Sequence, residues 1–166
     1  VGIGVVPETT WHSSRYALQL GLGASIFGDT TASGCQISAN TVSTLGSSLN
    51  GYKYINSDKA STYQQYDGQH NFRVASSGSA DGAITWNTAL TINNSGNVGI
   101  GTSSPTAVGS YRVLELNGTA GGYLSFEANG NKNAAIYTGT GAMGFETFNS
   151  LPIQIITGGA ERMRIH

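Results

Sequence analysis

Acidic residues are the first candidates for chemistry, because an enzyme that cuts polysaccharides needs two carboxyl groups. One donates a proton to the leaving sugar and the other acts as an ionised base or nucleophile. Nine acidic residues are present. Asp58, Asp67 and Asp81 lie in the contexts NSDK, YDGQ and ADG, where Asp favours turns through local hydrogen bonds. We therefore expect turn residues and no enzymatic activity, with glycan cleavage as the alternative.

The stretch GTGAMG, at 139–144, matches the glycine spacing of dinucleotide-binding loops, and Glu161 follows at about the distance of a ribose-binding acid. That pattern binds phosphate only where the loop opens a helix. Here it precedes FETFNSLPIQII, which is strand-like and contains a proline. The sequence therefore predicts a glycine-rich turn between two strands and no cofactor.

The histidines and the cysteine are isolated. His12, His70 and His166 lack the short spacing of zinc ligands, so we expect no metal site within one chain. On a threefold axis, one histidine from each of three copies is still a possible ligand set. Cys35 is the single cysteine and has no His, Lys or Arg near it in sequence. We expect it to be a small buried side chain rather than a reactive thiol.

Aromatic residues are concentrated in GYKYINSDKASTYQQYDGQH, at 51–70. A tyrosine ring offers an apolar face and a hydroxyl group, so an exposed cluster can stack on a sugar and bond its hydroxyls. The alternative is packing in the core or between chains. The sequence is compatible with both interpretations. The candidate receptor-binding residues are Tyr52, Tyr54, Tyr63, Tyr66 and His70.

The elements that must position these residues are strands. Apolar residues alternate with small or polar ones in VGIG, YALQL, ALTIN and RMRIH, which is the period of a strand with one buried face. Clusters of Gly, Asn, Asp and Ser separate further candidates. These are GYKYIN, NFRVAS, AITW, YLSFEA, AAIY, MGFETF and PIQII. The pattern predicts an all-β fold, with 57–66 as the one stretch that alternatively suits a short helix.

The phrase VGIG occurs twice, at 1–4 and at 98–101, and the likeness continues beyond it. Pro7 corresponds to Pro105, Leu18 and Leu20 correspond to Leu114 and Leu116, and Gly21 corresponds to Gly118 after one extra residue. Self-similarity of this kind is typical of repeat architectures. We therefore predict two β-repeat modules, 1–97 and 98–166.

Composition limits the partners. Charged residues make up 10% of the chain, against roughly 25% in an ordinary soluble domain. The formal net charge is −1, which gives no electrostatic reason to expect nucleic acid. No apolar run approaches the ~18 residues of a membrane helix, so we expect no membrane insertion.

Short strands rich in glycine give one chain little apolar area to bury. Glycines that alternate with Val and Ile suit several chains packed along a shared axis, where a Cβ atom would clash. Neighbouring chains would also cover open strand edges, which are a liability in a weakly charged protein. We therefore expect an intertwined homo-oligomer.

Two stretches of the sequence resemble a known protein family. NSGNVGIGTSSP, preceded by ALTI, and the closing GGAERMRI resemble the repeated module of bacteriophage tail fibre proteins, particularly those that end in an endosialidase-type intramolecular chaperone. The likeness is strong over 52–105 and 152–165, and weaker over 22–50 and 119–150. No chaperone domain is present in this sequence, so self-cleavage and assisted trimerisation lie outside it.

The resemblance implies an all-β, elongated, intertwined homotrimer of β-prism or β-sandwich-like modules on a virion tail fibre, assembled in the host cytoplasm. Its implied partners are further copies of the chain, other fibre or baseplate proteins, and a glycan or receptor on the host surface. Its implied role is structural, with host adsorption. The alternatives are a polysaccharide-degrading tail spike fragment and a cellular surface adhesin module.

Overall fold

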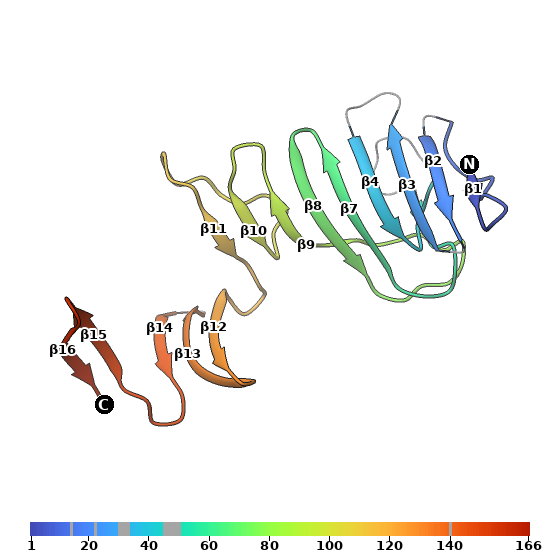
Figure 1. The fold of residues 1–166 in the computed structure, drawn as a ribbon. Helices are drawn as coiled ribbons and strands as arrows, with labels where there is room; N and C mark the ends of the chain where they lie inside the picture. The colour runs from blue at the N-terminus through green and yellow to red at the C-terminus, as the bar shows by residue number, and fades with distance from the viewer. Residues whose placement is uncertain (14, 22, 30–33, 45–50, 140) are drawn as a thin grey trace. The chain divides into compact units, whose positions relative to one another are not determined.

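The computed structural model describes all of the chain except residues 14, 22, 30–33, 45–50 and 140 (Figure 1). The described residues form strands, turns and loops and no α-helix, so the all-β prediction is confirmed. Contacts divide the chain into two compact units, Val1–Glu115 and Leu116–His166. Each unit is described by itself below.

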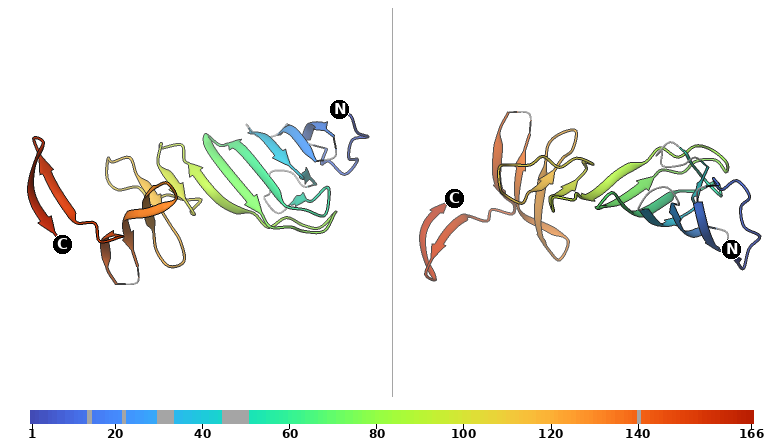
Figure 2. Two further views of the ribbon diagram at one scale, coloured as in Figure 1. Left: turned by 60° about the horizontal axis from the view of Figure 1, so that its bottom comes forward. Right: turned by 90° about the horizontal axis from the view of Figure 1, so that it is seen from above.

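The first unit is built on a nine-stranded sheet in the order β1-β2-β3-β4-β7-β8-β9-β10-β11 (Figure 1). β1 pairs with β2 in parallel, whereas the pairs from β2 to β10 are antiparallel (Figure 2). The short strands β5 (Val42–Ser43) and β6 (Tyr52–Lys53) pair separately. The sheet strands are β1 (Gly2–Ile3), β2 (Arg15–Leu20), β3 (Ala24–Asp29), β4 (Gly34–Ala39), β7 (Ala60–Tyr66), β8 (Gln69–Ala75), β9 (Asn87–Ile92), β10 (Val98–Ile100) and β11 (Leu114–Leu116).

The second unit contains two smaller antiparallel sheets. The first has three strands, β12 (Tyr123–Ala128), β13 (Asn131–Thr138) and β14 (Met143–Thr147). The second is a hairpin of β15 (Ile153–Thr157) and β16 (Ala160–Ile165). GTGAMG forms the β13–β14 turn, where the Gly139 amide donates to the Ala142 carbonyl at 3.1 Å. The predicted glycine-rich turn is confirmed, with its residue 140 outside the described residues.

Three sequence-based expectations differ from the structure. The helical alternative for 57–66 is wrong, because β7 occupies Ala60–Tyr66. AITW forms no full strand, and its Ala83 makes an isolated bridge to Lys53. Strands β3 and β4 were not predicted. In β4 the buried positions are polar, so the usual pattern of apolar residues facing inward is reversed.

The glycines of the VGIG phrases have a local explanation. A Cβ atom at Gly99 would lie 2.7 Å from Thr102 Cγ2 and 3.3 Å from Pro105 Cβ. At Gly2 it would lie 2.7 Å from Pro7 Cγ. The clash that requires glycine is therefore with the following loop of the same chain. Packing of several chains along a shared axis stays a prediction, and these two glycines do not depend on it.

The loop after each phrase is held by the same kind of hydrogen bond. The Glu8 amide donates to Gln19 Oε1 at 2.8 Å, and the Thr106 amide donates to Glu115 Oε2 at 2.8 Å. Glu115 occupies the position that corresponds to Gln19, so its carboxylate has a structural role here. The boundary between modules 1–97 and 98–166 stays a prediction, and β10 continues the same sheet as β9.

The hydrophobic core of the first unit is small and aromatic. Phe27 contacts Trp11 at a ring-centroid distance of 4.9 Å and Tyr52 at 6.4 Å. Tyr52 contacts Trp86 edge-on at 5.8 Å. These side chains gather on one face of the nine-stranded sheet, together with Tyr54, Ala60, Ala75 and Ile84. We call this the covered face.

Candidate functional site

The covered face of the sheet is largely polar outside its aromatic core. Ser38 and Thr62 share a hydrogen bond of 2.8 Å between hydroxyl groups, and Thr91 Oγ1 donates to Asn71 Oδ1 at 3.0 Å. Hydrogen bonding of this kind is what allows polar groups to be buried. The buried polar residues of the covered face are Gln19, Ser25, Gln36, Ser38, Thr62, Gln64, Asn71, Arg73 and Thr91.

Arg73 is the cation of this polar layer. Its side chain is buried, and its Nε and Nη1 atoms have no hydrogen-bond partner among the described residues. Burial lowers the pKa of Arg73 below its ordinary value, because removal from water disfavours the charged form. The covered face thus combines a small apolar core with costly polar burial.

The opposite face of the sheet is apolar and open. One residue from each of seven neighbouring strands lies in register to form a continuous row across it. Ile26 is 39% exposed, Ile37 55% and Phe72 41%. We call this row the apolar ridge. Its residues are Leu18, Ile26, Ile37, Tyr63, Phe72, Leu90 and Ile100.

The ridge is flanked by two hollows with small residues at their base. On one side Ala24, Ala39 and Ser61 lie beneath a space of about 510 Å³, which we call the alanine hollow. On the other side Gly28 and Cys35 line a space of about 420 Å³, the cysteine hollow. Cys35 is exposed in the single chain, so the expectation of a buried thiol is wrong for this state.

The ridge and the row on either side of it make up the open face. One flanking row is Leu20, Ala24, Ala39, Ser61 and Val74, and the other is Tyr16, Gly28, Cys35, Gln65, His70, Ile92 and Val98. These described residues include no Asp, Glu, Lys or Arg. A large exposed apolar patch marks an interaction site in soluble proteins. The open face is therefore the candidate functional surface.

The five candidate receptor residues do not lie on one surface. Tyr52 and Tyr54 are buried, at 2% and 5% exposed, and the Tyr54 hydroxyl donates to the Ser76 carbonyl at 2.6 Å. A ligand reaches these two rings only by opening the core. Their packing is the alternative that the sequence left open.

The other three candidates are accessible. Tyr63 lies on the ridge, where its hydroxyl bonds His70 Nδ1 at 2.6 Å and its ring stacks on Phe72 at 4.7 Å. Tyr66 lies at the end of β7 and is 37% exposed. The structure therefore brings Tyr63 and His70 together on the open face and leaves Tyr66 apart from them. Sequence reasoning missed Phe72, which lies beside Tyr63 on the open face. His70 and Phe72 are two residues apart in HNFRVAS, and this spacing places two side chains on the same face of a strand.

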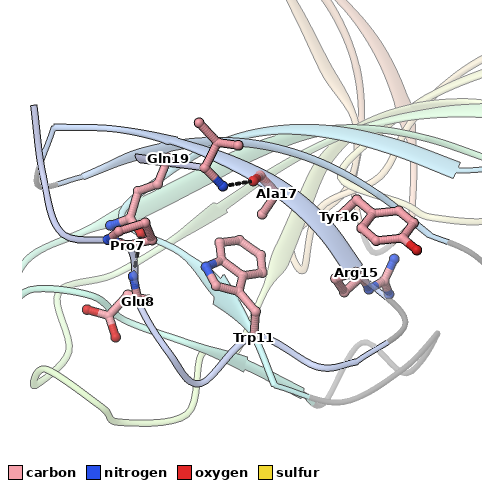
Figure 3. A pocket seen from close by; sticks show the side chains of 8 residues that line it. Pro7, Glu8, Trp11, Arg15, Tyr16, Ala17 and Gln19 are labelled. Carbon is pink, nitrogen blue, oxygen red and sulfur yellow. Dashed lines mark hydrogen bonds between the residues drawn. The ribbon is translucent and has the colours of Figure 1, made fainter. Parts of the chain in front are cut away.

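A separate cavity of about 350 Å³ lies beside β2 (Figure 3). Trp11, Tyr16 and Arg15 line it together with Glu8 and Gln19. Glu8 is the one carboxylate among the described residues of the lining, so this cavity does not hold the pair of carboxylates that glycan cleavage requires. Sequence reasoning did not single out Trp11, which stands in no periodic segment.

The acidic candidates lie in turns, as their contexts predict. Asp67 and Asp81 adopt positive φ values of 50° and 60°, a conformation that Asp tolerates. Asp58 Oδ1 accepts a hydrogen bond from the Lys59 amide at 2.7 Å. Within the described part of the chain, no three His, Cys, Asp or Glu side chains are grouped as metal ligands would be.

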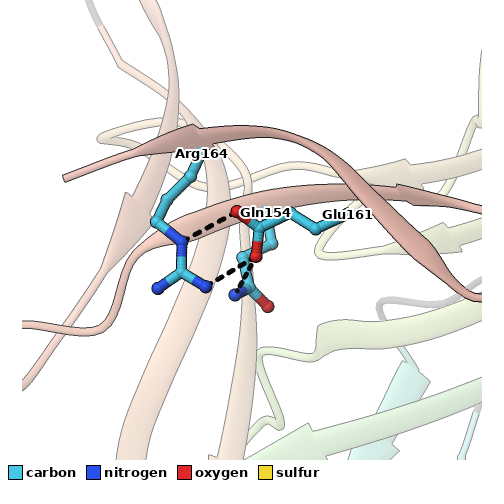
Figure 4. A network of polar contacts seen from close by, with 3 residues as sticks. All are labelled: Gln154, Glu161 and Arg164. Carbon is cyan, nitrogen blue, oxygen red and sulfur yellow. Dashed lines mark hydrogen bonds and ion pairs between the residues drawn. The ribbon is translucent and has the colours of Figure 1, made fainter.

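The β15–β16 hairpin carries a polar network on one face (Figure 4). Arg164 donates to both oxygens of Glu161, at 2.9 and 2.6 Å, and Gln154 Nε2 donates to Glu161 Oε2 at 2.9 Å. The hydrogen bond from Arg164 lowers the pKa of Glu161 below its ordinary value. The other face pairs Ile153 with Ile165 and Ile155 with Met163.

None of the described residues belongs to a helix of the length and hydrophobicity needed to cross a membrane. Comparisons of the chain with models of known protein families, with curated proteins and with solved structures found no match.

Proposed function

We propose that the chain is a structural and host-adsorption segment of a bacteriophage tail fibre and that it works as a homotrimer. The observation that supports this most directly is the reversed polarity of the nine-stranded sheet. Its buried positions are largely polar, and its open face carries the apolar ridge. A sheet of this kind leaves its best hydrophobic surface for a partner.

The size of the hydrophobic term supports assembly. Full burial of a Leu, Ile or Phe side chain contributes about 1.5–3 kcal/mol, and the ridge offers seven positions per chain. Ordering one residue of backbone costs about 1–2 kcal/mol. Ile26, Ile37, Phe72 and Ile100 are 39–55% exposed in the single chain, so burial of the ridge adds roughly half of the full hydrophobic contribution per side chain to a unit whose own core is small.

Three parts of the proposal are based on the resemblance of NSGNVGIGTSSP and GGAERMRI to tail fibre modules. They are the trimeric state, the location on the virion and the binding to a host surface. In this proposal the chain has no chemistry of its own and its partners are other copies, neighbouring fibre or baseplate proteins and a surface glycan or receptor. Tyr66 is the candidate receptor residue that stays exposed outside the open face.

The test measures binding to bacterial cells and cleavage of their glycans with the same protein preparation. Fluorescently labelled protein, in the form in which it is naturally expressed, is incubated with a panel of bacterial strains and with their purified capsular and lipopolysaccharide glycans. The proposal predicts retention on some strains without released oligosaccharide, and reduced retention for Tyr66→Ala at unchanged assembly.

Two outcomes contradict this proposal. Release of oligosaccharide assigns the glycan-cutting alternative, and a stable monomer that binds no strain removes both the fibre and the adsorption roles. Tyr66→Phe is the matched control, because it keeps the ring that would stack on a sugar.

A further inference from the structure

We propose that the open face is the contact surface between copies of this chain, with the apolar ridge of one copy seated in the alanine hollow of the next. This inference rests on the proposed assembly into a homo-oligomer. It adds which surface makes the contact and which parts of that surface meet.

The shape of the open face carries the argument. Ile37, Tyr63 and Phe72 rise as the ridge, and the row directly beside them has the short side chains of Ala39 and Ser61. Each chain therefore presents both a projecting row and a hollow of about 510 Å³. Ridge-in-hollow contact joins different parts of two identical surfaces, which is a heterologous interface, and such an interface closes into a ring when the rotation between copies allows it.

The dimensions of the open face determine how much surface it offers to neighbouring copies. Seven strands spaced about 4.8 Å apart span about 29 Å, and three rows of same-face residues cover about 17 Å along the strands. A flat patch of that size is roughly 500 Å² before side-chain relief is counted. A specific interface takes about 800 Å² from each partner, so the open face, whose ridge and hollow meet different neighbours, supplies two contacts that are each smaller than this standard size.

The chemistry of the open face selects the occupant. Its described residues lack Asp, Glu, Lys and Arg, so the face offers nothing to a polyanion or to a charged segment. The one histidine, His70, has Nδ1 bonded to the Tyr63 hydroxyl at 2.6 Å, which satisfies two polar atoms that burial would otherwise penalise. An uncharged apolar surface of matching composition is what a second copy supplies.

Cys35 lies on the flank of the ridge opposite the alanine hollow, so it reports whether the open face is covered as a whole. It is the single cysteine of the chain and is exposed in the cysteine hollow when the chain is alone. In the assembly the neighbouring copy covers the open face. We expect a thiol reagent such as dithionitrobenzoate to react at least about 100-fold more slowly with the native assembly than with chains separated in denaturant.

The matched control moves the thiol to the other side of the sheet. Ser79→Cys in a Cys35→Ser background places it in the exposed loop beside Tyr54, which belongs to the core of the covered face. This thiol is expected to react at the rate of a free cysteine in the same assembly. Fast reaction of Cys35 in a preparation whose mass shows several chains overturns the inference and leaves the proposed assembly standing.

A second variant tests the hollow itself. Ala39 is exposed, so Ala39→Trp fills the alanine hollow without a clash inside its own chain. We expect it to weaken assembly at least tenfold in concentration, with the circular dichroism of the chain unchanged, while Ala39→Ser assembles normally. Normal assembly of Ala39→Trp would contradict the inference that the ridge sits in the alanine hollow. A monomeric parent protein would instead contradict the proposed function.

Discussion

Ile37 of β4 and Tyr63 of β7 are direct cross-strand partners on the open face, while the adjacent pair Gln36 and Gln64 is buried on the covered face. Because side chains alternate along a strand, shifting β4 by one residue would bury Ile37 and expose Gln36. The sheet instead keeps its glutamines inside, where Gln36 Nε2 donates to the Tyr52 hydroxyl. The apolar side chains are thereby left for another surface.

A polar group on the ridge should weaken association between chains. Ile37→Asn places an amide where the proposed contact is apolar, and burial of an uncompensated amide costs about 1–3 kcal/mol. We expect the midpoint concentration of assembly to rise at least tenfold, measured by analytical ultracentrifugation over a loading series. Val108→Asn removes an apolar side chain that is equally exposed but outside the open face. If both variants shift assembly alike, the ridge has no special role.

Gly99→Ala should destabilise the loop after the second VGIG phrase. The new methyl group meets Thr102 Cγ2 at 2.7 Å, and overpacking of this kind costs about 1–3 kcal/mol. Urea unfolding at fixed protein concentration measures the loss, with solution mass unchanged. Gly23→Ala is the control, because its Cβ atom would meet no atom within 4 Å. Equal stability of the two variants would show that the loop yields without cost.

Substitution of Tyr54 distinguishes a packing role of this side chain from a receptor-binding role. Tyr54→Phe removes the hydrogen bond to the Ser76 carbonyl, a loss of about 1 kcal/mol in the free energy of unfolding. Tyr66→Phe, at the exposed end of β7, should change that free energy by less than about 0.5 kcal/mol. Thermal unfolding at one protein concentration distinguishes them. A Tyr54 variant of unchanged stability that no longer adsorbs to cells would restore its receptor role.

Acid should loosen the β15–β16 hairpin. The pKa of Glu161 is lowered in the folded state by the hydrogen bond from Arg164. The stabilisation is therefore present above the ordinary glutamate pKa of about 4.3, and it is lost as the pH falls through the lower folded value. The protection factors of the hairpin amides, corrected for intrinsic exchange at each pH, should fall in that window. Glu161→Gln should abolish the pH dependence and Glu146→Gln should keep it; the reverse result assigns the effect to another carboxylate.

The sequence predicts strands best where apolar residues alternate with polar ones within one short stretch. ALTIN and RMRIH form strands as predicted, and Asp67 and Asp81 occupy turns. Strand β4 was missed because its buried positions are Gln36 and Ser38, and no pattern within one strand tells which of its two faces a loop will cover.

The candidate site was less predictable than the strands. Tyr52 and Tyr63 are both tyrosines and are close in sequence, yet Tyr52 is buried in the core and Tyr63 lies on the open face. Register across the sheet decides this, and register depends on contacts between segments far apart in the chain. The ridge is likewise a property of seven strands together, visible only once their pairing is known.

The most direct test of assembly through the open face is the solution mass of the protein in its naturally expressed form, measured by light scattering coupled to gel filtration. We predict a mass three times that of the 17.2 kDa chain for the segment, falling toward one chain for Ile37→Asn. A parent protein that stays at the mass of one chain, with its ridge in water, would contradict the account.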